Sequence, residues 1–401
     1  MKDGRRVKRR PTLKPILFLP DDVVMEILSR MPVVDVLKCR RVCRRWNSLI
    51  LTSCFSDMHR KNHSSFPMIV VQEKLYCYNM TNLLLLVDRL EPSRKRTKLR
   101  KFCVDSILPV SKDLFIFRLH YDGLFVMGNL NVDRFVIFNP ITRDKVNLMI
   151  PTVPECDVMG MFFHPLIKEY CIIWGSFVAN PKPLFKMVNL SSKPFCKDIN
   201  PSASLVEGRI LHSKDPKVPV VIEKDAILYW MVDNCPENHS CEETIMAFDI
   251  KSEEFSFVPH PGPRHQDCNH EKHLNMQIFK MDGHLSLLQK TTKSRSVFII
   301  DIWSLKDSAA GLWMKIHSVP INIDQLGNVG WFDDRYFVAM VVVNGELFAH
   351  YRWRGWIQRI FGCNLETGIV RRMSRTYTYC CMDTYIPSFV SLKNCRSEIR
   401  I

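Results

Sequence analysis

Soft and imidazole ligands gather in one short stretch, "HPGPRHQDCNHEKH", which spans residues 260–273. The candidate ligands are His265, Cys268, His270 and His273, with His260 just before them. Thiolate and imidazole groups are the ligands that zinc prefers in proteins. The stretch also contains proline and glycine and lies between two strand-like runs, which is typical of a surface loop. We therefore favour a loop over a metal centre, and a zinc determination on the purified protein tests this preference.

The rest of the chain carries no recognisable catalytic signature. It lacks the phosphate-binding loop, the nucleophile elbow of hydrolases, the HExxH zinc motif and a dinucleotide fingerprint in a βαβ context. A catalytic cysteine needs a histidine that the fold brings beside it, and the sequence alone nominates no such pair. We predict a protein that is not an enzyme and that needs no cofactor.

Cysteine usage and the N-terminal residues indicate the compartment. The 15 cysteines are odd in number and scattered, which favours reduced thiols over a disulfide framework. The opening "MKDGRRVKRRPTLK" has no apolar core of a signal peptide. The longest apolar run, about 336–343, is shorter than the ~18 residues that a membrane-spanning helix needs. We expect a protein of the nucleus and/or cytoplasm that is neither secreted nor membrane-spanning.

Positive charge is concentrated in two short runs. Lysine and arginine exceed aspartate and glutamate by 56 − 41 = 15, and "KDGRRVKRR" near the start and "RKRTKLRK" at 94–101 hold much of the excess. Such runs serve as nuclear import signals or nucleic-acid patches. Neither run is interleaved with the aromatic residues that single-strand binders use. We favour a solvated tail and a surface loop, and nucleic acid is not the expected partner.

The stretch "LPDDVVMEILSRMPVVDVLKCRRVCRRWNSLI", residues 19–50, predicts a helical module. Four apolar residues share one helical stripe at spacings i, i+3, i+4 and i+7: Val24, Ile27, Leu28 and Met31. Pro32 ends this first helix because proline lacks the N–H and disfavours helical geometry in the residue before it.

A second helix follows, with Asp35 as its expected cap. Its apolar face carries Val42, Cys43, Trp46, Leu49 and Ile50, counted from Cys39. Its other face carries Lys38, Arg40, Arg41, Arg44 and Arg45. Two such helices cannot bury both apolar faces on each other, so one face is left for the rest of the chain or for another protein.

The order of residues within this module closely resembles the F-box, as found at the N-terminus of many plant proteins. The resemblance extends from Leu19 to about Arg60 and fixes the Leu-Pro opening, the Ile-Leu-Ser core, the second proline and the Val-Cys-x-x-Trp signature. It implies docking on a Skp-type adaptor and, through it, on a cullin scaffold. The residues it implies for that surface, directly or in support, are Leu19, Pro20, Val24, Ile27, Leu28, Met31, Pro32, Leu37, Val42, Cys43 and Trp46. Met31 and Val36 replace a usual leucine, and Cys39 replaces a frequent aromatic residue.

Downstream of the module, the pattern predicts a β domain. The hairpin dipeptides Asp122-Gly123, Asp282-Gly283 and Asn344-Gly345 lie between strand-like segments. An Asx-x-x-Ser/Thr motif recurs at the ends of apolar runs, with the Asx at positions 139, 189, 249, 301 and 364 and a weaker copy at 79. An Asx side chain starts a tight turn by binding the backbone two residues on.

The spacing of the motif, 50, 60, 52 and 63 residues, suits four strands per repeat. We therefore predict a small all-α module followed by a large all-β domain over 66–391. The favoured architecture of this domain is a β-propeller of about six blades, and a β-sandwich is the alternative. Trp174, Trp230, Trp303 and Trp331 are predicted to be core residues more readily than a binding face.

The same region resembles the F-box associated interaction domain of a large plant family. The matching landmarks are "YDGLFVM" with "FVIFNPITRDKVNL", "GMFFHPLIKEYCII", "AILYWMV" with "IMAFDIKSEEFSFVPHPG", "MDGHLSLLQ" and "IPSFVSL". The resemblance implies a domain that recruits a target protein, without implying which one. The expected organisation is a basic tail at 1–15, an F-box at 16–62 and the β domain at 66–391.

The predicted function is therefore a substrate-recognition adaptor of an SCF-type ubiquitin ligase. The alternative is a free-standing β-domain protein that binds glycans or nucleic acid and has no ligase role. A third interpretation is an F-box protein that has lost its ligase function. The target protein and any small-molecule co-ligand stay open at this point.

Overall fold

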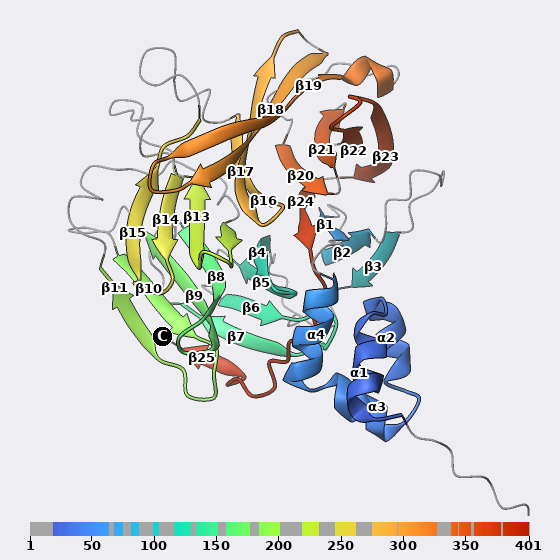
Figure 1. The fold of residues 1–401 in the computed structure, drawn as a ribbon, viewed down its shortest axis with the longest axis vertical. Coiled ribbons are helices and arrows are strands. Elements are labelled where there is room, and N and C mark those ends of the chain that lie inside the picture. Colours follow the sequence, from blue (N-terminus) through green and yellow to red (C-terminus); the bar gives the residue numbers. More distant parts are fainter. Residues whose placement is uncertain are drawn as a thin grey trace, which may run out of the picture. The chain divides into compact units, whose positions relative to one another are not determined.

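The computed structural model describes residues 19–63, 68–74, 82–87, 99–103, 116–129, 134–150, 158–176, 184–200, 219–231, 245–261, 275–294, 296–326, 338–343, 345–353, 357–377 and 380–400. The chain divides into two compact units, Met1–His63 and Ser64–Ile401. The first is helical and the second is built of strands (Figure 1).

Four short helices make up the helical unit: α1 (Asp21–Ser29), α2 (Val33–Cys39), α3 (Arg44–Ile50) and α4 (Ser53–His63). The expectation of one continuous second helix was wrong, because the chain turns between α2 and α3. Cys43 is extended (φ −158°, ψ 165°), and its Sγ accepts a hydrogen bond from the Trp46 amide at 3.4 Å. Helix α2 begins directly after Pro32, and Asp35 lies in its first turn beside Lys38 rather than capping it.

The helical unit has a small apolar core of its own, formed by Val24, Leu28, Val33, Val36, Ile50 and Phe55. Polar contacts join α4 to the end of α1 and to the turn between α1 and α2. His59 Nε2 lies 3.1 Å from the Met31 carbonyl oxygen, and Asn62 Nδ2 donates to Ser29 Oγ at 2.9 Å. Because α1 is held by α4, its inward face is fixed without the β domain.

The described strands of the second unit form six sheets, five with four antiparallel strands and one with a fifth, parallel strand at its edge. The first sheet consists of β24 (Cys380–Tyr385), β1 (Met68–Lys74), β2 (Asn82–Val87) and β3 (Leu99–Cys103), and the second of β4 (Ile116–Tyr121), β5 (Leu124–Asn129), β6 (Arg134–Phe138) and β7 (Lys145–Met149). The third consists of β8 (Val158–His164), β9 (Glu169–Ser176), β10 (Leu184–Asn189) and β11 (Cys196–Ile199), and the fourth of β12 (Val220–Ile222), β13 (Ile227–Met231), β14 (Ile245–Asp249) and β15 (Glu254–Val258). The fifth consists of β16 (Met276–Met281), β17 (His284–Thr292), β18 (Val297–Asp307) and β19 (Leu312–Asn322), and the sixth of β20 (Val338–Val343), β21 (Glu346–Trp353), β22 (Ile357–Asn364) and β23 (Val370–Tyr377). A short strand, β25 (Glu398–Arg400), runs parallel to β7 at its outer edge, and a 3₁₀ turn, η5 (Ile323–Leu326), follows β19.

Consecutive sheets pack face to face through shared apolar clusters, so the six sheets follow one another as blades. The ring closes where β24 joins β1, with Met68 opposite Tyr385. Tyr385 packs on Phe125 of the next blade at 4.8 Å between ring centroids, and β24 also runs beside β20. The predicted six-bladed β-propeller is confirmed, and the alternative of a β-sandwich is wrong (Figure 1).

The hairpin dipeptides join the first and second strands of their blades. Asp122 and Gly123 have φ values of 48° and 78°, and Asp282 and Gly283 have 50° and 73°, as a turn with two left-handed residues requires. Gly123 is needed for space as well, because a Cβ there would lie 2.7 Å from the backbone nitrogen of Ser388. The C-terminal segment therefore packs directly on this turn.

The Asx turns join the third and fourth strands. The Oδ1 atoms of Asn139, Asp249 and Asn364 each accept the amide two residues on, at 2.8, 2.8 and 3.0 Å. Asn189 closes a wider loop by accepting the Phe195 amide at 2.6 Å. The turns at Asn139, Asp249 and Asn364 agree with the predicted motif, and the loop at Asn189 departs from it.

The motif at Asp301, the fourth of the five along the chain, was placed wrongly. Asp301 lies inside β18, where its carboxylate pairs with Lys315 at 3.0 Å. Asp307 caps the turn instead, because its Oδ1 accepts the Ala310 amide at 3.0 Å. The spacings become 50, 60, 58 and 57 residues, counted between positions 139, 189, 249, 307 and 364. The weaker copy at Asn79 lies outside the described residues.

Two of the four tryptophans are confirmed as core residues, since Trp174 and Trp230 are fully buried. The indole nitrogen of Trp230 donates to the Met159 carbonyl oxygen at 3.0 Å. Trp303 is partly buried, and the Lys315 ammonium lies 4.7 Å from its ring centroid. Trp331 lies outside the described residues.

Candidate functional sites

Helix α1 presents two different apolar stripes. Val24 and Leu28 are buried in the core of the helical unit. Val23 and Ile27 are four residues apart, which places them on one side of the helix, and they are 37% and 49% exposed. Leu19, four residues before Val23, precedes the helix and is 51% exposed. The predicted stripe of Val24, Ile27, Leu28 and Met31 is therefore divided between core and surface.

A further exposed apolar side chain stands at the turn between α2 and α3. Val42 is 64% exposed, and its neighbours Arg41, Cys43 and Arg44 are exposed as well. Together with the α1 stripe, these side chains give what we call the exposed apolar set: Leu19, Val23, Ile27 and Val42. Exposed apolar side chains that lie together are the usual feature of a docking surface, whereas single ones are common on any protein.

Arg45 fixes the start of α1 against α3. Its Nε lies 2.6 Å from Asp21 Oδ1, and its Nη2 donates to the Leu19 carbonyl oxygen at 2.7 Å. Leu19 precedes the helix and has no helical hydrogen bonds of its own, so this contact orders it before any partner arrives. Ordering in advance lowers the entropic cost of binding.

The structure distributes the predicted docking residues over three environments. Exposed are Leu19, Pro20, Ile27, Pro32, Val42 and Cys43; partly buried are Met31, Leu37 and Trp46; buried are Val24 and Leu28. Val24 and Leu28 hold α1 in the core of the helical unit, so their side chains are not accessible to a partner. The sequence analysis did not select Val23, although its position four residues from both Leu19 and Ile27 was the available signal.

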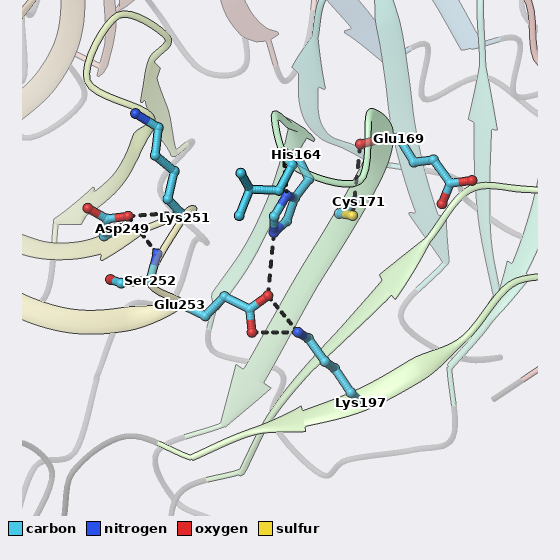
Figure 2. A network of polar contacts seen from close by, with 9 residues as sticks. His164, Glu169, Cys171, Lys197, Asp249, Lys251, Ser252 and Glu253 are labelled. Atoms are coloured by element: carbon cyan, nitrogen blue, oxygen red, sulfur yellow. Dashed lines mark hydrogen bonds and ion pairs between the residues drawn. The ribbon is translucent and has the colours of Figure 1, made fainter.

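In the β domain, the most prominent polar network links two blades (Figure 2). His164, at the end of β8, points its Nε2 toward Glu253 Oε1 at 3.4 Å, and its Nδ1 accepts the Leu166 amide at 3.3 Å. Because Nδ1 is the acceptor, Nε2 carries the proton and donates to Glu253. Lys197, from β11, forms an ion pair with the same carboxylate. Glu253 belongs to the β14–β15 turn, so the network clamps neighbouring blades together.

The thiol nearest this network is not suited to be a nucleophile. Cys171 is fully buried, with its Sγ 4.0 Å from the Glu169 carbonyl oxygen. Burial raises the pKa of the Cys171 thiol to about 12, and the carboxylates of Glu169 and Glu253 raise it further toward that value. A thiol that stays protonated at neutral pH neither attacks a substrate nor binds a metal well.

Two other described thiols, those of Cys363 and Cys395, also have a raised pKa. Burial is the main cause that raises the pKa of Cys363 and of Cys395 to about 11. The described residues contain no group of three or more His, Cys, Asp or Glu side chains placed to hold a metal ion. The zinc candidates His265, Cys268, His270 and His273 lie outside the described residues, while His260 is buried with its Nδ1 3.0 Å from the Pro261 carbonyl oxygen.

Comparison with known families agrees with both units. Residues 16–57 match the model of the F-box domain, and residues 75–378 match the model of the F-box associated beta propeller domain. The second match alone covers more than half of the chain. The chain belongs to this family of F-box proteins. Its organisation, with the F-box first and the associated propeller after it, is the one that the resemblance implied.

Curated relatives of this F-box protein come from Arabidopsis thaliana. F-box protein At3g47030 is 24% identical over 64% of this chain and 62% of its own length. F-box protein At3g07870 is 24% identical over 75% of this chain and 72% of its own length, and F-box only protein 8 is 25% identical over 63% and 84%. The chain thus spans somewhat less than two thirds of the length of the first of these relatives.

Among solved structures, TolB from Acinetobacter baumannii aligns with a TM-score of 0.45 at 9% identity, over 82% of this chain and 72% of TolB.

Within the described residues, no helix has the length and apolarity needed to cross a membrane.

Proposed function

We propose that this F-box protein is the substrate-recognition adaptor of an SCF-type ubiquitin ligase. Its helical unit docks a Skp-type adaptor, and through it a cullin scaffold, while the propeller holds a target protein. The observation that carries the proposal is the exposed apolar set on a helical unit that already has its own core. We retain 16–62 as the docking part and 66–391 as the recruiting part.

Energetics favour a protein partner for the exposed apolar set. Fully burying a Val, Leu or Ile side chain is worth roughly 1.5–3 kcal/mol, and about half of each side chain in the set is still in contact with water. A partner that covers four such side chains gains several kcal/mol, which offsets part of the ~4–15 kcal/mol lost in translational, rotational and side-chain freedom.

The proposed role needs no catalytic residue in this chain. A target held by the propeller is brought close to the conjugating enzyme, so the transfer step occurs at a high effective concentration. The high pKa values of the buried thiols agree with a non-catalytic subunit. We expect this subunit to work in the nucleus and/or cytoplasm, where ubiquitin ligases find their targets, and without a cofactor.

Co-purification tests the proposal. The full chain is co-expressed with a plant Skp-type adaptor, beside a Leu19→Ala, Val42→Ala variant and a Leu166→Ala control. Leu166 is an equally exposed apolar residue of the propeller, at 67%. We expect the wild type and the control to retain the adaptor and the double variant to lose it.

An adaptor that is not retained by the wild type contradicts the proposal and favours the free-standing β-domain protein. The nucleic-acid form of that alternative is recognised by its salt dependence: the logarithm of affinity for nucleic acid falls linearly with the logarithm of salt concentration, whereas docking of a target protein need not show this dependence. Retention of the adaptor by the double variant contradicts the assigned surface but leaves the ligase role open.

A further inference from the structure

Charge in the helical unit is distributed unevenly. Between residues 19 and 63, nearby carboxylates hold several cations, as in the pairs Arg30–Glu26, Lys38–Asp35, Arg45–Asp21 and Arg60–Asp57. Arg40 donates to the side chain of Asn47 at 3.1 Å. Arg41 and Arg44 are exposed and have no ion pair or side-chain hydrogen bond with any described residue.

These two arginines flank Val42, the most exposed large apolar residue in the described part of the unit. Arg41 directly precedes Val42 in the chain, and Arg44 begins α3 two residues after it. Any partner that covers Val42 therefore meets two guanidinium groups at the edge of the same contact. Among the acids of residues 19–63, Asp22 is the one outside these ion pairs, and it lies in the first turn of α1, where it complements the helix dipole.

The chemistry of the partner follows from this arrangement. A basic partner surface would repel the two guanidinium groups, and a purely apolar one would strip their water without compensation. A carboxylate accepts two parallel hydrogen bonds from one guanidinium, which satisfies charge and geometry together. Phosphates of a nucleic acid could also pair with arginine, but they offer no apolar surface for Val42 and Ile27.

We propose that Arg41 and Arg44 recognise carboxylate side chains on the adaptor, so that the docking surface of the adaptor is acidic where it covers the α2–α3 turn. This inference rests on the proposed function and specifies its partner. The apolar set supplies the contact area, and the two arginines accelerate encounter and fix the register of the complex.

Titration of the full chain with the purified Skp-type adaptor at 50, 150 and 500 mM NaCl tests this inference. The test variant is Arg41→Glu, Arg44→Glu, and the control is Lys251→Glu, Lys306→Glu, which changes the net charge equally on exposed residues of the propeller. We expect the test variant to bind at least 10-fold more weakly at 50 mM salt and the difference to shrink at 500 mM, because salt screens exposed charges. The control should bind like the wild type at every salt concentration.

The outcomes separate the two proposals. If the wild type binds and the test variant binds equally well at 50 mM salt, the arginine inference is overturned while the ligase role stands. If the wild type does not bind the adaptor at all, both proposals fail. If the test variant keeps the adaptor but loses affinity for a duplex DNA probe, the arginines serve nucleic acid and the inference is again overturned.

Discussion

Removing three members of the exposed apolar set should abolish most adaptor affinity and leave the fold intact. The change is Leu19→Ala, Ile27→Ala, Val42→Ala in the full chain. These side chains are 51%, 49% and 64% exposed, so much of each is available to a partner and little of each supports the core.

The size of the effect follows from the exposed fractions. Full burial of such a side chain is worth roughly 1.5–3 kcal/mol, so its exposed half contributes about 1 kcal/mol when a partner covers it. Three truncations therefore cost about 3 kcal/mol of binding, which is about a 100-fold rise in Kd. In contrast, Leu28→Ala removes a side chain that is 1% exposed and should cost about 2–5 kcal/mol of folding stability.

Calorimetric titration with the adaptor gives the Kd, and thermal unfolding followed by circular dichroism gives the stability. We expect the triple variant to unfold at nearly the temperature of the wild type and to bind far more weakly. Binding within threefold of the wild type would refute the assigned surface. A large loss of stability in the triple variant would refute the division of α1 into an inner and an outer stripe.

Three further predictions concern single residues. Iodoacetamide at pH 8 should label the exposed Cys43 and spare the buried Cys171, because burial raises the pKa of the Cys171 thiol to about 12. Bound adaptor should slow the labelling of Cys43, and mass spectrometry of the labelled peptides tests both expectations. Glu253→Ala should destabilise the propeller by about 1–3 kcal/mol, because the buried Nε2–H of His164 loses its acceptor, and Glu253→Gln should cost less; equal melting temperatures for the two variants would contradict this. Asp307→Ala should cost about 1 kcal/mol by removing the turn contact to the Ala310 amide, and an unchanged urea midpoint would show that the turn does not need it.

Local patterns in the sequence were sufficient to predict the repeating part of the fold. Asp-Gly and Asx turns are formed by residues close in sequence, so their chemistry can be read directly from the chain. The error at Asp301 arose because β18 continues past it to Asp307, and strand length depends on pairing with β19 rather than on the motif.

Contacts between distant residues could not be predicted in the same way. His164 and Glu253 are 89 residues apart, and only the packing of adjacent blades brings them together. Within the helical unit, the periodicity correctly indicated amphipathic helices, but which stripe of α1 is covered depends on α4, whose Phe55 and His59 complete the core. The break before α3 depends on the extended backbone of Cys43, which a helical period does not register.

The pairing of β24 with β1 has a consequence for how the protein is made. Met68 cannot pair with Tyr385 until Tyr385 has been synthesised, which is 385 − 68 = 317 residues later. At the usual ~5–20 residues per second, the first blade stays incomplete for at least ~15 seconds of translation, with the edge of β1 open to mispairing. The polar contacts that join α4 to the end of α1 and the turn after it span 28 and 33 residues of the chain, so the helical unit can be folded long before that. Under the proposed function, a newly made chain would therefore engage an adaptor before its propeller could hold a target.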